Sequence, residues 1–244
     1  MEKLKQSSFV SVIAVFAALN IVCDSLVGPP LPFSGVWYSW IFVAEPINGI
    51  ILAPYASFFS SLIGVMVGHS IYVRDSTEFL FTLGAPIGAM ISSLIFRGKW
   101  KMALIYYSAL LGAFFITPIS WQLPFWGMWD VYLAFGCLLV SVVVMEKRKG
   151  LWNTKSTGVR LLYIVAVCTF VGLEADVLFR IFILIPCQTY WIFFGLDVSA
   201  LQPIWAVGAV ETSTKVALST LVSMLVTPAI ITAVRKMGLT FSKD

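Results

Sequence analysis

The stretch Arg160–Ile185, RLLYIVAVCTFVGLEADVLFRIFILI, decides the fold, because it is apolar sequence long enough to cross a bilayer. A transmembrane helix needs about 20 apolar residues at a rise of 1.5 Å per residue. After Arg160, only Glu174, Asp176 and Arg180 place charge in this stretch. Backbone groups surrounded by hydrocarbon must be hydrogen-bonded within the chain, so the stretch predicts an α-helix.

Seven further apolar stretches flank this one on both sides. The whole chain is 59% hydrophobic and 11% charged, whereas a soluble domain carries about 25% charged residues. We therefore predict an all-α, polytopic integral membrane bundle of about eight spans, at 8–27, 37–53, 55–73, 79–96, 102–119, 129–145, 160–185 and 206–234.

The basic residues predict how such a bundle is threaded. Lys and Arg gather before the first span, at 97–101, at 147–160 and at 235–243, while the alternate junctions contain only Arg74. Loops rich in Lys and Arg stay cytoplasmic, so both termini are expected inside the cell. The basic residues are scattered among short loops, which argues against a nucleic-acid partner.

Ionisable residues inside the spans are the main functional signal. Each costs about 2.5–3.5 kcal/mol on insertion scales, so such residues usually face an interior cavity. Counted along their helices at 1.5 Å per residue, these ionisable residues fall at one level in the outer half of the bundle: His69, Glu174, Arg180, Glu211 and Lys215. Asp176–Arg180 and Glu211–Lys215 are spaced i,i+4 and can pair on one helix face. Two interpretations stay open: the pairs hold the helices together, or the charges form a solute site.

For a solute site, we expect substrate contacts from Glu45, His69, Glu174, Glu211 and Lys215. The outer loops are rich in Pro and Trp, and we expect Trp37 and Trp126 to cover the solute. The alternative for these rings is an aromatic belt at the headgroup level. Arg180 is expected to extend towards the headgroups, so that it could be removed together with Asp176.

The sequence lacks the residues and motifs that several kinds of chemistry require. The chain contains one His, no H-E-x-x-H motif and no G-x-x-x-x-G-K-[ST] phosphate loop, so we predict no metal and no cofactor. We do not expect an enzyme. The enzymatic alternative is acid–base chemistry by Glu174 and Asp176 on a lipid-borne substrate.

The run Glu45–Gly64 and the run Gly84–Lys99 resemble helices of the substrate-binding S components of energy-coupling factor (ECF) vitamin transporters. Ala14-x-x-x-Ala18 is similar to the stripe by which S components dock on a transmembrane coupling subunit, and the last helix resembles that of archaeal members. The resemblance implies a six-span core at 1–149 and two further spans at 150–244, completing a single membrane domain in a prokaryotic plasma membrane.

The same resemblance implies a function. The chain would bind a small polar, ring-containing solute such as a vitamin, nucleobase or cofactor precursor, beneath the loop Val27–Val36. A coupling subunit and ATPases would energise uptake in trans. The alternative transporter is a stand-alone secondary carrier in which Glu45 or Glu174 takes up a proton.

Overall fold

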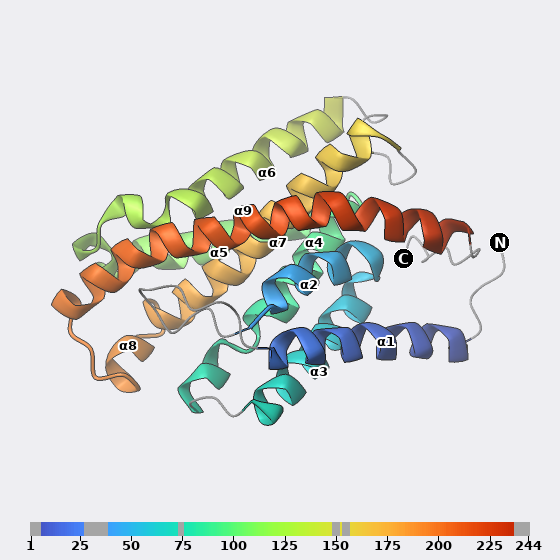
Figure 1. Cartoon of the computed structure of the whole chain (residues 1–244). Helices are drawn as coiled ribbons and strands as arrows, with labels where there is room; N and C mark the ends of the chain where they lie inside the picture. Colours follow the sequence, from blue (N-terminus) through green and yellow to red (C-terminus); the bar gives the residue numbers. More distant parts are fainter. Residues whose placement is uncertain (1–5, 27–38, 73–75, 148–151, 153–156, 237–244) are drawn as a thin grey trace.

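The computed structural model describes residues 6–26, 39–72, 76–147, 152 and 157–236. Within these residues every regular element is a helix, as predicted (Figure 1). The longer helices are α1 (Gln6–Ser25), α2 (Ile41–Ile51), α3 (Pro54–Ile71), α4 (Gly84–Phe96), α5 (Trp100–Ile116), α6 (Trp129–Lys147), α7 (Val159–Leu184) and α9 (Val198–Lys236). The short ones are η1 (Ser76–Phe81), η2 (Pro118–Gln122), η3 (Phe125–Met128) and α8 (Thr189–Ile192).

Each predicted span contains one long helix, but the helices differ in how far they could cross a bilayer. Four apolar helical stretches are long enough to span: Phe79–Phe96, Phe125–Lys147, Val159–Leu184 and Val198–Lys236. In contrast, α2 has 11 residues, which is about 16 Å at 1.5 Å per residue, roughly half of the hydrocarbon thickness. The four long stretches support a membrane protein.

Two helix ends depart from the predicted ones for local reasons. Helix α9 begins at Val198 rather than at 206, because Asp197 precedes it and its Oδ1 accepts hydrogen bonds from the Ala200 amide (2.8 Å) and the Ser199 hydroxyl (2.7 Å). This is the side-chain cap that helix starts favour. Helix α2 ends before Pro54, which starts α3 and cannot donate a backbone hydrogen bond.

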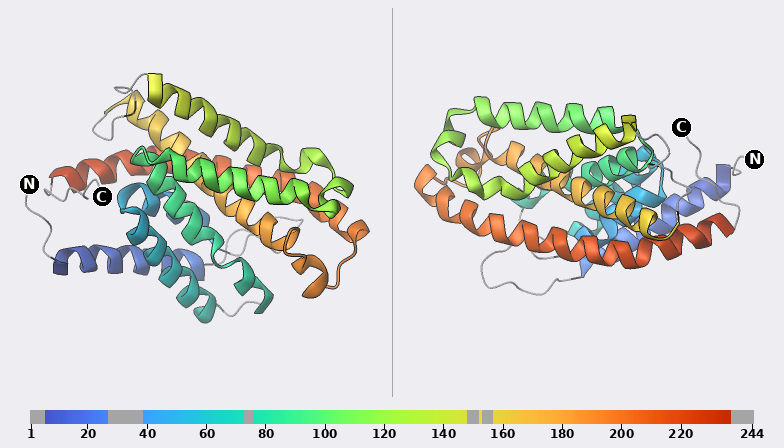
Figure 2. Two further views of the ribbon diagram at one scale, coloured as in Figure 1. Left: turned by 180° about the vertical axis from the view of Figure 1, so that it is seen from behind. Right: turned by 90° about the horizontal axis from the view of Figure 1, so that it is seen from above.

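Helix α7 is the centre of the bundle. It packs against α2, α4, α5, α6 and α9, while α1 packs mainly on α3 (Figures 1 and 2). One continuous apolar core includes Ile95, Tyr107 and Leu138 together with Val165 and Leu178. The stretches 1–149 and 150–244 therefore share one core.

Glycines allow the closest helix approaches. A Cβ on Gly88 of α4 would lie 2.8 Å from the carbonyl oxygen of Gly172, and a Cβ on Gly172 of α7 would lie 2.9 Å from that of Gly88. On α3, Gly64 and Gly68 lie against Asn20 and Asp24 of α1. These glycine pairs thus pack the bundle internally, which is the common use of small residues between membrane helices.

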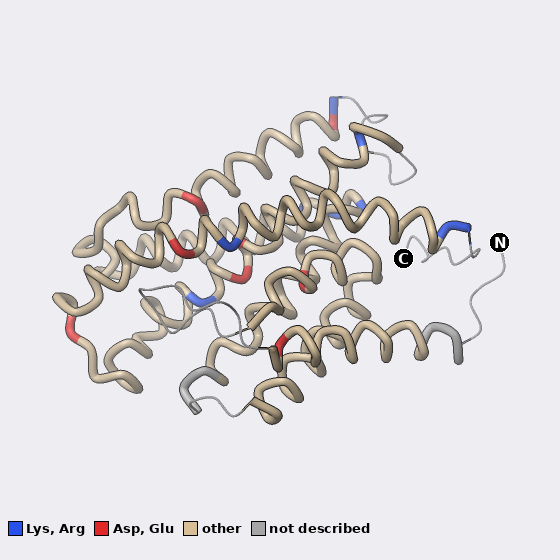
Figure 3. The backbone as a smooth tube through the Cα atoms, in the orientation of Figure 1, with Lys and Arg blue, Asp and Glu red and all other residues tan. Residues whose placement is uncertain are grey.

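The basic residues of the described chain lie mostly at one end of the bundle. Figure 3 shows blue segments at helix ends on the side where α1 begins and α9 ends. They include Lys147 at the end of α6, Arg160 at the start of α7, and Arg235 and Lys236 at the end of α9. This separation of charge follows the pattern in the sequence.

Candidate functional site

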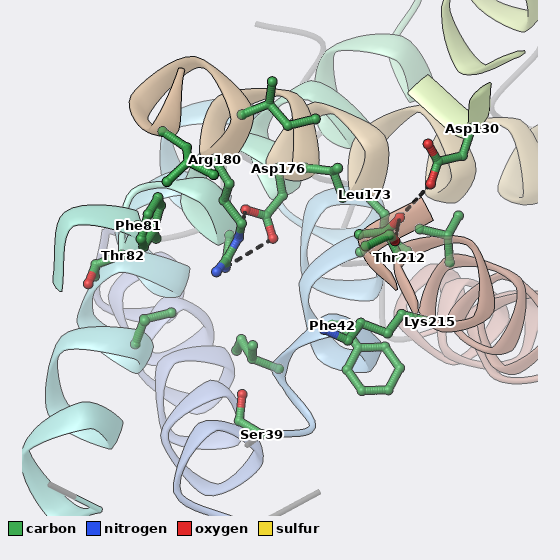
Figure 4. Close-up of a pocket in the computed structure, with 18 of the residues that line it drawn as sticks. Ser39, Phe42, Phe81, Thr82, Asp130, Leu173, Asp176, Arg180, Thr212 and Lys215 are labelled. Carbon is green, nitrogen blue, oxygen red and sulfur yellow. Dashed lines mark hydrogen bonds and ion pairs between the residues drawn. The ribbon is translucent and has the colours of Figure 1, made fainter. Parts of the chain in front are cut away.

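A cavity of about 280 Å³ lies within the bundle. Its lining residues lie near the ends of α1, α3 and α7 and near the starts of α2, α4 and α6, away from the basic ends of α6, α7 and α9. Its walls come from α1, α2, α3, α4, α6, α7 and α9, with η1 and η3 (Figure 4). Most of the wall is apolar, and the rings of Phe42, Phe81 and Trp205 form part of it. The volume is at the lower end of the range for small-molecule sites, about 300–1,000 Å³.

Six titratable residues from five helices line this one cavity. They are Asp24, His69, Asp130, Asp176, Arg180 and Lys215. The convergence is a property of the fold, because α1, α3, α6, α7 and α9 contribute at most two of them each. A largely apolar pocket with a few converging polar groups is the usual composition of a ligand site.

Helix α7 contributes an ion pair to the wall. Nε of Arg180 donates to Oδ1 of Asp176 at 2.7 Å, and Nη2 donates to Oδ2 at 3.3 Å. Gly84 of α4 faces this pair, and a Cβ there would collide with Oδ1 of Asp176. The i,i+4 pairing predicted from the sequence is confirmed. The predicted extension of Arg180 towards headgroups is not what the structure has, because Arg180 bonds to Asp176 and lines the cavity instead.

Helix α9 contributes a second i,i+4 pair. Nζ of Lys215 lies 3.4 Å from Oε1 of Glu211, again as predicted. Lys215 lines the cavity, whereas Glu211 is buried beside it and does not. Arg180 of α7 and Lys215 of α9 thus line the same cavity, each beside a carboxylate of its own helix.

Asp130 at the start of α6 joins that helix to α9. The hydroxyl oxygens of Thr212 and Ser213 lie 2.5 and 3.0 Å from its Oδ2. Its Oδ1 accepts a hydrogen bond from the Val131 amide at 2.9 Å. The two hydroxyls also lie 2.7 and 2.6 Å from the carbonyl oxygens of Gly208 and Ala209 one turn earlier, so each hydroxyl is shared between that carbonyl and Asp130.

Asp24 and His69 join α1 to α3 at another part of the wall. Nδ1 of His69 lies 2.8 Å from Oδ2 of Asp24, and both side chains are buried. Gly68, one residue earlier on α3, leaves room for the Asp24 carboxylate. The ring of Phe79 lies beside the imidazole, with 5.3 Å between ring centroids.

Glu45 and Glu174 occupy a different environment, behind the wall rather than on it. Both are fully buried, and neither is among the residues that line the cavity. Their carboxylate oxygens have no hydrogen-bond partner in the part of the chain that the structure describes. Oε1 of Glu45 lies against Gly88, at the crossing of α2, α4 and α7.

The structure therefore places the predicted substrate residues in different environments. His69 and Lys215 line the cavity; Glu211, Glu45 and Glu174 are buried outside it. Trp126 is 57% exposed on η3 and does not reach the cavity. Its neighbour Gly127 has no side chain, and Trp205 of α9 occupies the space against it. Trp37 and the loop Val27–Val36 lie outside the described residues.

Sequence reasoning missed most of the cavity wall. Asp24 and Asp130 had a usable signal, since each is a lone carboxylate at the end of a predicted span. No local pattern marks Phe42, Phe81, Thr212 or Trp205, because these residues meet the cavity only through long-range packing. In the described part of the chain, no three His, Cys, Asp or Glu side chains are grouped to hold a metal ion.

No family model, no curated protein and no solved structure matches this chain. The likeness to S components rests on the quoted sequence runs alone, and it remains a hypothesis.

Proposed function

We propose that this chain is a membrane-embedded, high-affinity binding subunit for uptake of a small polar, ring-containing solute. The observation that carries the proposal is that six titratable side chains from five helices converge on one shared cavity. Charged groups inside a membrane bundle are costly, and their usual reason is a substrate or ion pathway. The aromatic walls suit a planar ring, which stacks favourably against Phe42, Phe81 or Trp205.

The proposed topology has eight spans with both termini in the cytoplasm of a prokaryotic cell. Three features support it: each predicted stretch overlaps one long helix, the described basic residues gather mostly at the end where α1 begins and α9 ends, and the cavity lies away from that end. Helix α2 would cross only part of the bilayer, and the turn to α3 would be enclosed by protein. Arg97 stabilises that turn, since its guanidinium lies within 3.5 Å of the carbonyl oxygens of Gly49 and Ile51.

The proposed energy source is a coupling subunit with ATPases, docked on α1. Ala14 and Ala18 are exposed on α1, in contrast to the glycines of α3, which are packed inside the bundle. Small exposed residues on a membrane helix allow another helix to approach closely. Ala14 and Ala18 are thus accessible to a partner helix. Their spacing is also the sequence feature that suggested a docked coupling subunit.

The test is to fill the cavity without disturbing the fold. Gly208 of α9 lines the cavity, and a Cβ there meets no atom within 4 Å. We expect Gly208→Trp to occupy the space and abolish solute binding at an unchanged melting temperature. Gly112→Trp on α5 is the matched control, because Gly112 also has open space and lies outside the cavity.

The readout is mass spectrometry of small molecules that copurify with each protein. A solute found with the wild type and with Gly112→Trp, and absent from Gly208→Trp, supports the proposal. Equal occupancy of the Gly208→Trp protein would place the solute elsewhere and refute it.

A second candidate, a stand-alone proton-coupled carrier, is favoured by Glu45 and Glu174. Fully buried carboxylates without a hydrogen-bond partner are costly when ionised and could exchange a proton as the helices move. Purified protein in liposomes separates the two candidates. Solute accumulation driven by a proton gradient alone favours the carrier, whereas binding without accumulation favours the subunit.

A further inference from the structure

The two ion pairs at the cavity are oriented the same way, and this orientation bears on the solute. The side chain of Arg180 is 31% exposed and that of its partner Asp176 is 13% exposed. Lys215 is 14% exposed and its partner Glu211 is 6% exposed. In both pairs the cation is the more open member. Arg180 from α7 and Lys215 from α9 both line the cavity (Figure 4).

From this arrangement we infer that the solute carries a carboxylate group, which binds between Arg180 and Lys215. This inference rests on the proposed function and names the chemistry of the solute in the same cavity. Each cation has a carboxylate one turn earlier on its own helix, which lowers the cost of holding two positive groups near each other in an empty site. A ligand anion between them would gain charge-assisted hydrogen bonds from two helices at once.

The rest of the wall distinguishes a carboxylate from a phosphate. Asp24, Asp130 and Asp176 line the same cavity, so a doubly charged phosphate would meet more repulsion from them than a singly charged carboxylate. A singly charged, planar carboxylate matches the flat guanidinium of Arg180. The aromatic rings of Phe42, Phe81 and Trp205 leave an apolar region for a ring attached to that carboxylate.

Pairs of a carboxylic acid and its neutral amide test this inference directly. We would compare nicotinate with nicotinamide and benzoate with benzamide, by thermal shift and equilibrium dialysis on the full-length protein in detergent. A charge-assisted contact discriminates by about tenfold or more, so each acid should bind at least tenfold more tightly than its amide.

The double variant Glu211→Gln with Lys215→Met should abolish this preference, because it removes one cation without leaving an unpaired buried carboxylate. Asp176→Asn with Arg180→Gln is the second variant, in case the first fails to fold, and should have the same effect. Lys236→Met, which removes an exposed cation from the far end of the same helix, should leave the preference unchanged.

Two results would overturn the inference: amides that bind as tightly as acids, or an acid preference that survives in both double variants. Failure of both acids to bind at millimolar concentration would also count against it. The proposed function is tested separately. If amides bind to the wild type and not to Gly208→Trp, the cavity is the site and only the carboxylate is wrong.

Discussion

The α4–α7 crossing and the cavity both lie against α7, but glycine has opposite roles in them. At the crossing, the Gly88 and Gly172 backbones touch, and no side chain fits between them. At the cavity, Gly208 faces open space, and the wall combines charged, aromatic and aliphatic side chains. Substitutions at the crossing should therefore affect folding, whereas substitutions at the cavity should affect what the protein binds.

The largest expected effect is on stability, at the crossing. Gly172→Leu would force α4 and α7 apart, because a Cβ there would collide with Oγ of Ser92 and would lie 2.9 Å from the carbonyl oxygen of Gly88, which cannot rotate away. Overpacking of this kind costs about 1–3 kcal/mol or more. We expect a large loss of melting temperature in detergent, while Gly112→Leu on α5 stays close to the wild type. A Gly172→Leu protein as stable as the control would show that the crossing is looser than described.

The second-largest expected effect is a loss of uptake without loss of binding, caused by a substitution on the exposed face of α1. Ala18→Trp should leave the melting temperature and solute affinity nearly unchanged, because Ala18 is exposed and does not line the cavity. Uptake in cells should fall to background if a coupling subunit docks there. Leu19→Trp, at an exposed position about 100° around the helix from Ala18, serves as a control for a bulky ring on α1. Unimpaired uptake by Ala18→Trp would remove the structural support for a docked partner.

A smaller effect is expected at the two carboxylates behind the cavity wall. Glu45→Gln and Glu174→Gln keep the side-chain shape and remove a buried ionisable group, so folding should be preserved. In a binding subunit, solute affinity in equilibrium dialysis should change by less than about twofold, since neither residue lines the cavity. In a proton-coupled carrier, accumulation driven by a proton gradient should be lost instead.

The smallest effect is expected at the start of α9. Hydrogen bonds from the Ser199 hydroxyl and the Ala200 amide hold the pKa of Asp197 below its ordinary value. A lowered folded-state pKa means that this stabilisation is present above the unfolded pKa and is lost as the pH falls through the folded one. Asp197→Asn should therefore lower the melting temperature slightly at neutral pH, with the difference from the wild type shrinking below about pH 4. A constant difference across that range would exclude the charge as the cause.

Local features of the fold could be read from the sequence, and long-range ones could not. Apolar length located the helices, and the i,i+4 spacing located both ion pairs, because each depends only on neighbours along the chain. The short α2 and the early start of α9 depended on a turn at Pro54 and on a cap at Asp197. The meeting of Asp24, Phe42 and Trp205 around one cavity depends on how α1, α2 and α9 pack, and no local pattern encodes it.

Labelling of a cysteine placed at Gly208 tests the central claim most directly. In a variant whose four native cysteines are replaced by alanine or serine, Gly208→Cys would carry its thiol on the cavity wall. We expect a membrane-impermeant maleimide to label it from the outside of intact cells, and the copurifying solute to protect it. Labelling only after the cytoplasmic side is exposed would contradict the proposed orientation, and labelling that the solute leaves unchanged would contradict the cavity as its binding site.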